Sequence, residues 1–327
     1  MLLGIDIGGT KSRLAACEMQ DGKLVRRTDQ IYVSSETESL AALVADYRRR
    51  HPHPIEAIGI GAAGPVVGRR VKLTNLTWDI DADHLAAVTG TPVTLVNDLV
   101  AHAYGLPHVS SEFREVLQAG VVRAGNAAMI AAGTGLGEAI LAWDGKRHIP
   151  LATEGGHVDF APPTAEDEGL LPFIRRKHPG HVSWERVVSG RNGWRNIYDY
   201  MVERGELKPS AAYAERLQHA EDIGAVIGEA LKAGEAFAAP LVRRFVRLYG
   251  AEAGNLALKS LAVGGMYVVG SVATKLLPQL RRDGFVESFA AKGRFEPLLK
   301  QVPVIVITDP DLAVKGAAAA AFGSFSS

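Results

Sequence analysis

The chain begins with an apolar run that carries one aspartate, Asp6, and ends in two glycines and a threonine, GIDIGGT over residues 4–10. Residues 2–7 and 13–17 are each predicted to form a strand, and only the glycine turn separates them. A dinucleotide fingerprint needs a helix and a third glycine after its loop, and a P-loop needs its own glycine–lysine spacing. Neither pattern is present, so the chain opens with a glycine hairpin.

Strands and helices alternate along much of the remaining chain. Further strands are predicted at residues 55–62, 92–96, 127–132, 266–269 and 302–307, and helices at 36–50, 82–88 and 99–106. The chain after residue 163 is mainly helical through about residue 261, and Pro310 is expected to open a last helix of small residues. This alternation is typical of α/β layers, and 327 residues suffice for about two domains.

Composition excludes several classes of function. Lys+Arg and Asp+Glu balance at 36 each, so no net charge draws the chain to nucleic acid or to an anionic membrane. A single cysteine, Cys17, rules out a disulfide framework, and we expect it to pack as a small hydrophobe on a strand. No apolar window approaches the ~20 residues that span a bilayer, and no leader pattern opens the sequence. We therefore expect a cytoplasmic protein.

Glycine turns follow three of the predicted strands. They are Gly8-Gly9-Thr10, the loop GTGLG at residues 133–137, and Gly264-Gly265 with Gly270-Ser271. Glycine lets a backbone N–H approach a phosphate because no Cβ stands in the way. Each loop alone also fits an ordinary turn. Their recurrence after apolar strands favours phosphate binding.

Two polar residues, Asn97 and Asp98, stand where a predicted strand gives way to a helix. Ligands bind at this edge of open α/β sheets. Asparagine and aspartate are also favoured helix N-caps. A cap explains one of the two residues more easily than both, so the sequence leaves both readings open.

Two further polar stretches carry candidate side chains. TEGGHVDF, residues 153–160, presents Glu154 and His157 around a glycine pair, with a solvated loop as the alternative. A metal site would need more ligands than this stretch offers. In HVSWERVVSG, residues 181–190, Ser183 is predicted to cap a helix that has Glu185 in its first turn. The helix dipole favours a carboxylate there whatever its function.

Taken together, these stretches resemble the bacterial ATP-dependent glucokinase family of actin-like sugar kinases. GIDIGGTKSR resembles its first phosphate loop, GTGLG its second, VVGSV at residues 268–272 its adenosine loop, and LVNDLVA at residues 95–101 its catalytic segment. TNLTWDI (74–80), EGGHVDFAP (154–162), GHVSWERVVSG (180–190) and GNLAL (254–258) are similar to family stretches almost word for word. The matches occur in order along essentially the whole chain.

The chain departs from the family at two positions. Lys11 stands where some members have asparagine, and Ser271 where a second glycine is common. The related ROK kinases usually carry a zinc-binding cysteine cluster. One cysteine cannot form it, so the resemblance is to the branch without zinc.

The resemblance implies a two-lobed, actin-like (ribonuclease H-like) α/β fold with a cleft between the lobes. The small lobe would comprise residues 1–108 and 309–327, and the large lobe residues 109–308. The implied reaction is ATP-dependent phosphorylation of the glucose 6-hydroxyl, with Mg²⁺ as cofactor and a homodimer as the assembly. The alternatives are a kinase for another hexose, a catalytically weak sugar-binding regulator, and an actin-like filament protein.

The same resemblance assigns residue roles. Asp98 would be the general base, and the sugar would be bound by Asn97, Asp98, Glu154, His157 and Glu185. ATP would be bound by Asp6, Gly8, Gly9, Thr10, Lys11, Gly133, Thr134, Gly135, Gly137 and Gly270, with Asp6 holding Mg²⁺ through water. Carboxylates suit a neutral polyol, because they accept hydrogen bonds from hydroxyl groups.

Overall fold

The computed structural model describes residues 1–73 and 78–323. Its contacts divide the chain into two compact units. Unit 1 comprises Met1–Arg114, Pro150–Ala152 and Asp309–Ser327, and unit 2 comprises Glu115–Ile149 and Thr153–Thr308. Residues 74–77 of the TNLTWDI stretch lie outside the described residues.

A six-stranded mixed sheet forms the centre of unit 1. Its order is β3-β2-β1-β5-β8, with β4 also pairing with β2. The strands are β1 (Leu2–Ile7), β2 (Lys11–Gln20), β3 (Lys23–Arg26), β4 (Gln30–Val33), β5 (Ala57–Ala62) and β8 (Val93–Asn97). β1 is antiparallel to β2 and parallel to β5, so the predicted opening hairpin is confirmed. Cys17 is fully buried on β2, also as predicted.

Short elements surround this sheet. The helices are α1 (Leu40–Arg50), α2 (Ala82–Thr89), α3 (Asp98–Gly105) and α13 (Leu312–Gly323), with 3-10 turns η1 (Ser34–Glu36), η2 (Leu106–His108) and η3 (Ser111–Phe113). β6 (Arg70–Lys72) and β7 (Asp79–Asp81) form a separate ribbon. The expected helix at 36–50 begins only at Leu40, because the Ser39 hydroxyl accepts a hydrogen bond from the Ala42 N–H and caps it there.

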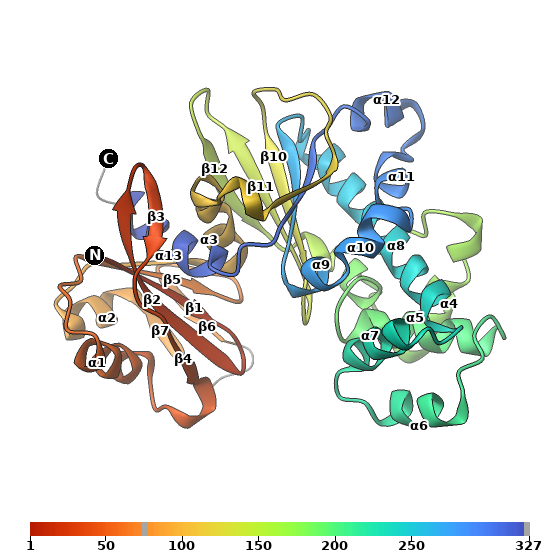
Figure 1. Cartoon of the computed structure of the whole chain (residues 1–327), viewed down its shortest axis with the longest axis horizontal. Helices are drawn as coiled ribbons and strands as arrows, with labels where there is room; N and C mark the ends of the chain where they lie inside the picture. Colours follow the sequence, from red (N-terminus) through yellow and green to blue (C-terminus); the bar gives the residue numbers. More distant parts are fainter. Residues whose placement is uncertain (74–77, 324–327) are drawn as a thin grey trace. The chain divides into compact units, whose positions relative to one another are not determined.

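The last helix of the chain packs against the first strands. Figure 1 shows α13, in blue, beside the red strands β1 and β2. A Cβ on Gly4 would lie 1.9 Å from the Val314 carbonyl oxygen, and one on Gly59 only 1.7 Å from that of Ala317. On the other side of α13, a Cβ on Gly316 would lie 1.7 Å from the Ala101 oxygen of α3. Glycine therefore lets this helix touch both the sheet and α3 backbone to backbone.

Charged side chains hold the start of α13. Arg13 of β2 donates to both oxygens of Asp29, at 2.8 and 2.7 Å, and to Asp311 at 2.7 Å. It also donates to the carbonyl of Pro310 at 2.6 Å. The prediction that Pro310 opens the helix is wrong: α13 begins at Leu312, and this bond holds Pro310 in the segment before it.

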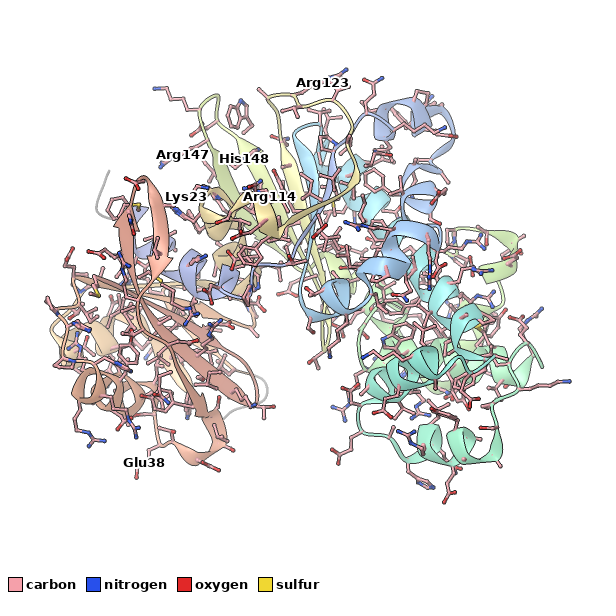
Figure 2. The ribbon with its side chains drawn as sticks, viewed as in Figure 1. Lys23, Glu38, Arg114, Arg123, Arg147 and His148 are labelled. Carbon is pink, nitrogen blue, oxygen red and sulfur yellow. The ribbon has the colours of Figure 1, made fainter. Side chains whose placement is uncertain are left out.

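Unit 2 contains a second six-stranded sheet, in the order β12-β11-β10-β13-β14-β9. The strands are β9 (Arg114–Gln118), β10 (Ala127–Ala132), β11 (Leu136–Trp143), β12 (His148–Thr153), β13 (Gly265–Val269) and β14 (Val304–Ile307). β11 and β12 were not predicted. Figure 2 labels Arg147 and His148 at the turn between them, and His148 Nε2 lies 3.0 Å from the Gly125 oxygen.

Helices supply most of the core of unit 2. They are α4 (Leu170–Lys177), α5 (Asn192–Glu203), α6 (Ala211–His219), α7 (Ile223–Ala233), α8 (Ala238–Ser260), α9 (Ser271–Lys275), α10 (Leu277–Arg282), α11 (Phe285–Ala290) and α12 (Glu296–Leu299). The 3-10 turns are η4 (Gly155–His157), η5 (Ala165–Asp167), η6 (Trp184–Arg186) and η7 (Gly293–Phe295). In α8, the Phe245 ring stacks on Trp194, and the Tyr249 hydroxyl accepts the Ala132 N–H of β10. In the part of the chain that the structure describes, no helix has the length and apolar character needed to cross a membrane.

The close packing of α13 on the sheet predicts that two glycine-to-alanine substitutions change stability in opposite directions. Gly59→Ala places a methyl group against the Ala317 carbonyl, which cannot rotate away, and should destabilise the protein by about 2–3 kcal/mol. Gly228→Ala, inside α7 with nothing within 4 Å of its Cβ, should instead stabilise by about 0.5–1 kcal/mol. Urea unfolding of both variants measures the difference. Equal effects would contradict the backbone contact.

Candidate active site

The junction of β8 and α3 positions Asn97 and Asp98. Asn97 Oδ1 accepts the N–H groups of Leu99 and Val100, at 2.9 and 3.4 Å, so Asn97 is the N-cap of α3. Asp98 is the first helical residue, and its Oδ1 also accepts the Leu99 N–H at 2.9 Å. Capping of α3 therefore explains the amide side chain of Asn97. The carboxylate of Asp98 requires a further explanation.

Asp98 lies in a poorly solvated environment near a second carboxylate. Gly61 of β5 admits α3 to the sheet, since a Cβ there would lie 2.8 Å from the Ala101 methyl. Burial raises the pKa of Asp98, His102 and the Leu99 N–H lower it, and Asp6 raises it further. Burial likewise raises the pKa of Asp6 on β1. Two carboxyl groups held this way favour a proton or a cation nearby.

The first glycine loop is closed by a bond within the loop and by Ser34, which was not a predicted site residue. The Gly8 N–H donates to the Lys11 oxygen at 3.0 Å. Ser34 of η1 donates its N–H to the Thr10 oxygen at 3.0 Å and its hydroxyl to the Gly8 oxygen at 3.3 Å. Gly9, Thr10 and Lys11 are exposed along this braced turn. The loop thus has a fixed shape and an open outer face.

The second glycine loop is also a hairpin turn, because β10 and β11 are antiparallel on either side of it. Gly133 donates to the Gly135 oxygen at 2.9 Å, and the Gly190 N–H donates to the Gly133 oxygen at 2.5 Å. A Cβ on Gly133 would meet no atom within 4 Å, and Thr134 is exposed. Gly270, at the end of the neighbouring strand β13, has a φ of +92° that favours glycine.

Glu185 links this second loop to the EGGH segment. Its Oε2 accepts the Leu136 N–H at 3.3 Å and lies 3.6 Å from His157 Nε2. Ser183 is the N-cap of η6 and Glu185 lies in its first turn, but η6 is only a single 3-10 turn and the Ser183 side chain makes no cap bond. A helix dipole therefore does not account for Glu185. Its contact with the loop does.

The same residues line a cavity of about 400 Å³. The lining includes His157, His181, Glu185, Arg186 and Asn192. His181 Nε2 lies 2.6 Å from the His157 oxygen and holds that backbone in place. Glu154 precedes η4 and is exposed, and its carbonyl accepts the His157 N–H at 2.9 Å. Carboxylate, imidazole and guanidinium groups around one cavity suit a ligand rich in hydroxyl groups.

Each unit thus holds part of the predicted set. Unit 1 holds Asp6, Gly8, Gly9, Thr10, Lys11, Asn97 and Asp98, and unit 2 holds Gly133, Thr134, Gly135, Gly137, Glu154, His157, Glu185 and Gly270. His102 was not predicted, although its place four residues after Asp98 puts it on the same helix face. The Nδ1 of His102 donates to the backbone carbonyl oxygen of Asp98 at 2.7 Å.

The oxygen donors of this site suit a metal ion that binds together with substrate phosphates. Among residues 1–73 and 78–323, no group of three or more His, Cys, Asp or Glu side chains could hold a metal ion. Mg²⁺ typically uses one or two carboxylates, and keeps waters and substrate phosphates as its other ligands. The partly buried carboxylate of Asp6 is such a group.

Comparison with known proteins gives a consistent result. The family model Glucokinase matches residues 2–323. The chain is 36% identical to a glucokinase of Trichormus variabilis, over 97% of this chain and 98% of that one. It is 34% identical to one of Synechocystis sp., over 97% and 96% of the two chains.

Solved structures agree on the fold. A crystal structure of glucokinase from an Antarctic psychrotroph superposes with a TM-score of 0.84 at 30% identity, covering 98% of both chains. A ROK-family glucokinase from Streptomyces griseus, in complex with glucose and AMPPNP, gives 0.68 at 23% identity, covering 98% and 99%. The predicted fold class, the two-lobed actin-like α/β fold of sugar kinases, is confirmed.

The cap of α3 predicts the stability of two variants at one position. Asn97→Ala removes the cap and should cost about 1 kcal/mol. Asn97→Ser keeps a capping oxygen and should be about 1 kcal/mol more stable than Asn97→Ala. Both lose the 3.3 Å bond from Asn97 Nδ2 to the Gly64 oxygen, so their difference isolates the cap. Thermal unfolding measures it, and equal losses would argue against a capping role.

Proposed function

Because this chain belongs to the glucokinase family, we propose that it transfers the γ-phosphoryl group of ATP to the 6-hydroxyl of glucose, giving glucose 6-phosphate and ADP. It is an ATP-dependent hexose kinase. One observation supports this proposal above the others. Glu185 lines the cavity with His157 and also accepts the Leu136 N–H of the GTGLG loop. One hydrogen bond thus joins a residue proposed to bind the sugar to the loop proposed to bind phosphate.

Sugar recognition is proposed for Glu154, His157 and Glu185, together with Asn97 and Asp98. Ionised carboxylates accept hydrogen bonds from hydroxyl groups and repel an incoming phosphorylated sugar. A site that pairs each hydroxyl rejects analogues that lack one, because its own polar groups would stay unpaired. The side chain of Glu154 is exposed in this structure and is free to take up such a bond.

Asp98 is proposed as the base that accepts the proton of the glucose 6-hydroxyl. Phosphoryl transfer depends mainly on positioning and charge stabilisation, with a carboxylate accepting the acceptor's proton. Burial raises the pKa of Asp98 and makes it a better base than an exposed aspartate. Its bond from the Leu99 N–H fixes one oxygen and orients the other.

The nucleotide is assigned to the glycine loops of both units. Gly8, Gly9, Thr10 and Lys11 would contact the phosphates from unit 1, and residues 133–137 with Gly270 from unit 2. Asp6 would hold Mg²⁺ through water. Bound there, the ion neutralises charge on the transferred phosphoryl group.

A coupled assay of ADP release with MgATP and a panel of hexoses tests the proposal. Glucose should give the highest kcat/KM, and glucose 6-phosphate should not be phosphorylated. Preference for mannose or an amino sugar would reassign the substrate. Glucose binding without turnover would favour a sugar-binding regulator, and ATP-dependent filaments in sedimentation would favour the actin-like alternative.

We also propose that the enzyme acts in the cytoplasm, in glycolysis, as a homodimer. These three statements rest on the family resemblance. Cell fractionation tests the first, growth of a deletion strain on glucose tests the second, and sedimentation equilibrium tests the third.

Removal of the proposed base should affect turnover more than binding. Asp98→Asn keeps the size of the side chain and its bond from Leu99 but cannot take a proton. General-base catalysis typically contributes ~10²–10⁴-fold, so kcat should fall by about that factor. Glucose affinity, measured by calorimetry, should change much less. Full turnover by a folded Asp98→Asn enzyme would leave Asp98 with a structural role only.

The proposed sugar carboxylates should affect kcat/KM for glucose. A hydrogen bond to a charged group contributes ~1.5–3 kcal/mol, so Glu154→Ala or Glu185→Ala should lower kcat/KM by roughly tenfold to a hundredfold or more. Glu215→Ala, on the exposed face of α6, serves as the matched control and should match the wild type. Near wild-type kinetics in both test variants would refute the sugar assignment.

A further inference from the structure

Two buried glutamates that the proposed mechanism does not use lie behind the EGGH segment. Glu138 is on β11 and Glu252 is on α8, and their exposed fractions are 2% and 0%. Carboxylates are almost never fully buried unless they are paired. The pair therefore requires a physical explanation.

The surroundings of the two carboxyl groups are unequal. Glu252 accepts from Asn255 Nδ2 at 2.7 Å and from Lys259 Nζ at 3.2 Å. The same Lys259 Nζ, on a side chain that is 45% exposed, lies 3.8 Å from Glu138 Oε2. Within the described residues, neither oxygen of Glu138 has a hydrogen-bond donor. As a carboxylate, Glu138 would be an unsatisfied buried charge.

A proton bound to the Glu138 carboxyl group would remove this unsatisfied charge. Burial, and then the neighbouring Glu252, raise the pKa of Glu138 to about 8, while Lys259 lowers it. Two carboxylates in one buried place do not both ionise at neutral pH. A proton on Glu138 makes it a donor, and Glu252 is the acceptor beside it. Glu138 is therefore mostly protonated at pH 7.

Glu138 also lies directly against the EGGH segment. A Cβ on Gly155 would lie 2.0 Å from Glu138 Oε2, so glycine is required for this contact. Thr153 Oγ1 donates to the Glu138 carbonyl at 2.8 Å and accepts the Gly155 N–H at 3.2 Å. A Cβ on Gly156 would lie 2.0 Å from the Leu136 oxygen. The start of β11 is therefore the surface on which this segment rests.

We propose that Glu138 is a positioning residue for glucose binding: its carboxyl group, paired with Glu252, supports Gly155 and thereby sets the places of Glu154 and His157. The proposal rests on the assignment of the sugar site to these residues. It assigns no contact between Glu138 and the substrate.

Ionisation of Glu138 should loosen this support. The charged and titratable groups near the carboxyl pair are Glu252, Tyr249 and Lys259 on α8, with Lys292 bonded to Asn255 at 2.6 Å. Lys259 Nζ lies 3.8 Å from Glu138 Oε2 on a side chain that is 45% exposed, so it stabilises a negative charge on Glu138 only weakly. A group with a pKa near 8 is roughly nine-tenths protonated at pH 7 and roughly one-tenth protonated at pH 9. Glucose affinity should therefore fall across this interval.

Calorimetry of glucose binding without ATP, at pH 7 and pH 9, tests the proposal on the full chain. The wild type should lose affinity at least about threefold between the two pH values. Glu138→Gln keeps the shape and a donor but cannot ionise, so it should bind as the wild type does at pH 7 and show no loss at pH 9. Glu138→Ala should bind glucose about tenfold more weakly at pH 7. ATP affinity should change far less in either variant.

The controls separate this proposal from the assignment of function. Glu215→Gln, on the exposed face of α6, should retain the pH response of the wild type. Absence of glucose binding by the wild type would refute the function itself. A loss at pH 9 that persists in Glu138→Gln, or a wild type with no such loss, would overturn the role of Glu138. If Glu138→Ala fails to fold, the Glu138→Gln pH comparison still decides.

Discussion

Backbone-to-backbone contact through glycine is the constraint on which unit 1 depends. At Gly4, Gly59 and Gly316 a single methyl group would lie within 2 Å of a carbonyl oxygen. α13 is thereby held against the sheet on one side and against α3 on the other. The place of Asp98 at the start of α3 follows from this packing, because Gly61 sets the distance between α3 and β5. The position of Asp98, the proposed base, thus depends on glycines that carry no functional group.

In unit 2, glycine allows the same kind of close contact around the residues proposed to bind ligands. Gly135 admits the carboxylate of Glu185, Gly155 admits that of Glu138, and Gly190 admits the Gly133 carbonyl. Close approach without a Cβ lets the second glycine loop, the EGGH segment and η6 pack on one strand, β11. A change in the position of this strand would therefore displace both the residues proposed to bind phosphate and those proposed to bind the sugar.

The apolar strands could be predicted from the sequence because their pattern is local. β1 and β10 have the predicted bounds, since each is an apolar run that a glycine turn ends. β11 was missed because Glu138 interrupts its apolar pattern, and only a partner on a distant helix makes that burial tolerable. The sequence likewise left open whether Asn97 and Asp98 cap a helix or act in catalysis, because the answer depends on residues distant in the chain. Which carboxyl group lies beside Asp6 is a property of the sheet, and neighbouring residues do not encode it.

The seat of α13 on β1 and β5 also has a consequence for synthesis of the chain. Unit 2 is built almost entirely from one continuous stretch, whereas unit 1 needs residues 309 onward to cover its first strands. At about 5–20 residues per second, a ribosome takes roughly a quarter of a minute to a minute to proceed from the first strands to residue 309. Throughout that time the glycine-lined face of the nascent β1–β5 sheet lacks its helix. Unit 2 therefore has all of its residues before unit 1 does, and unit 1 closes only after α13 has left the exit tunnel.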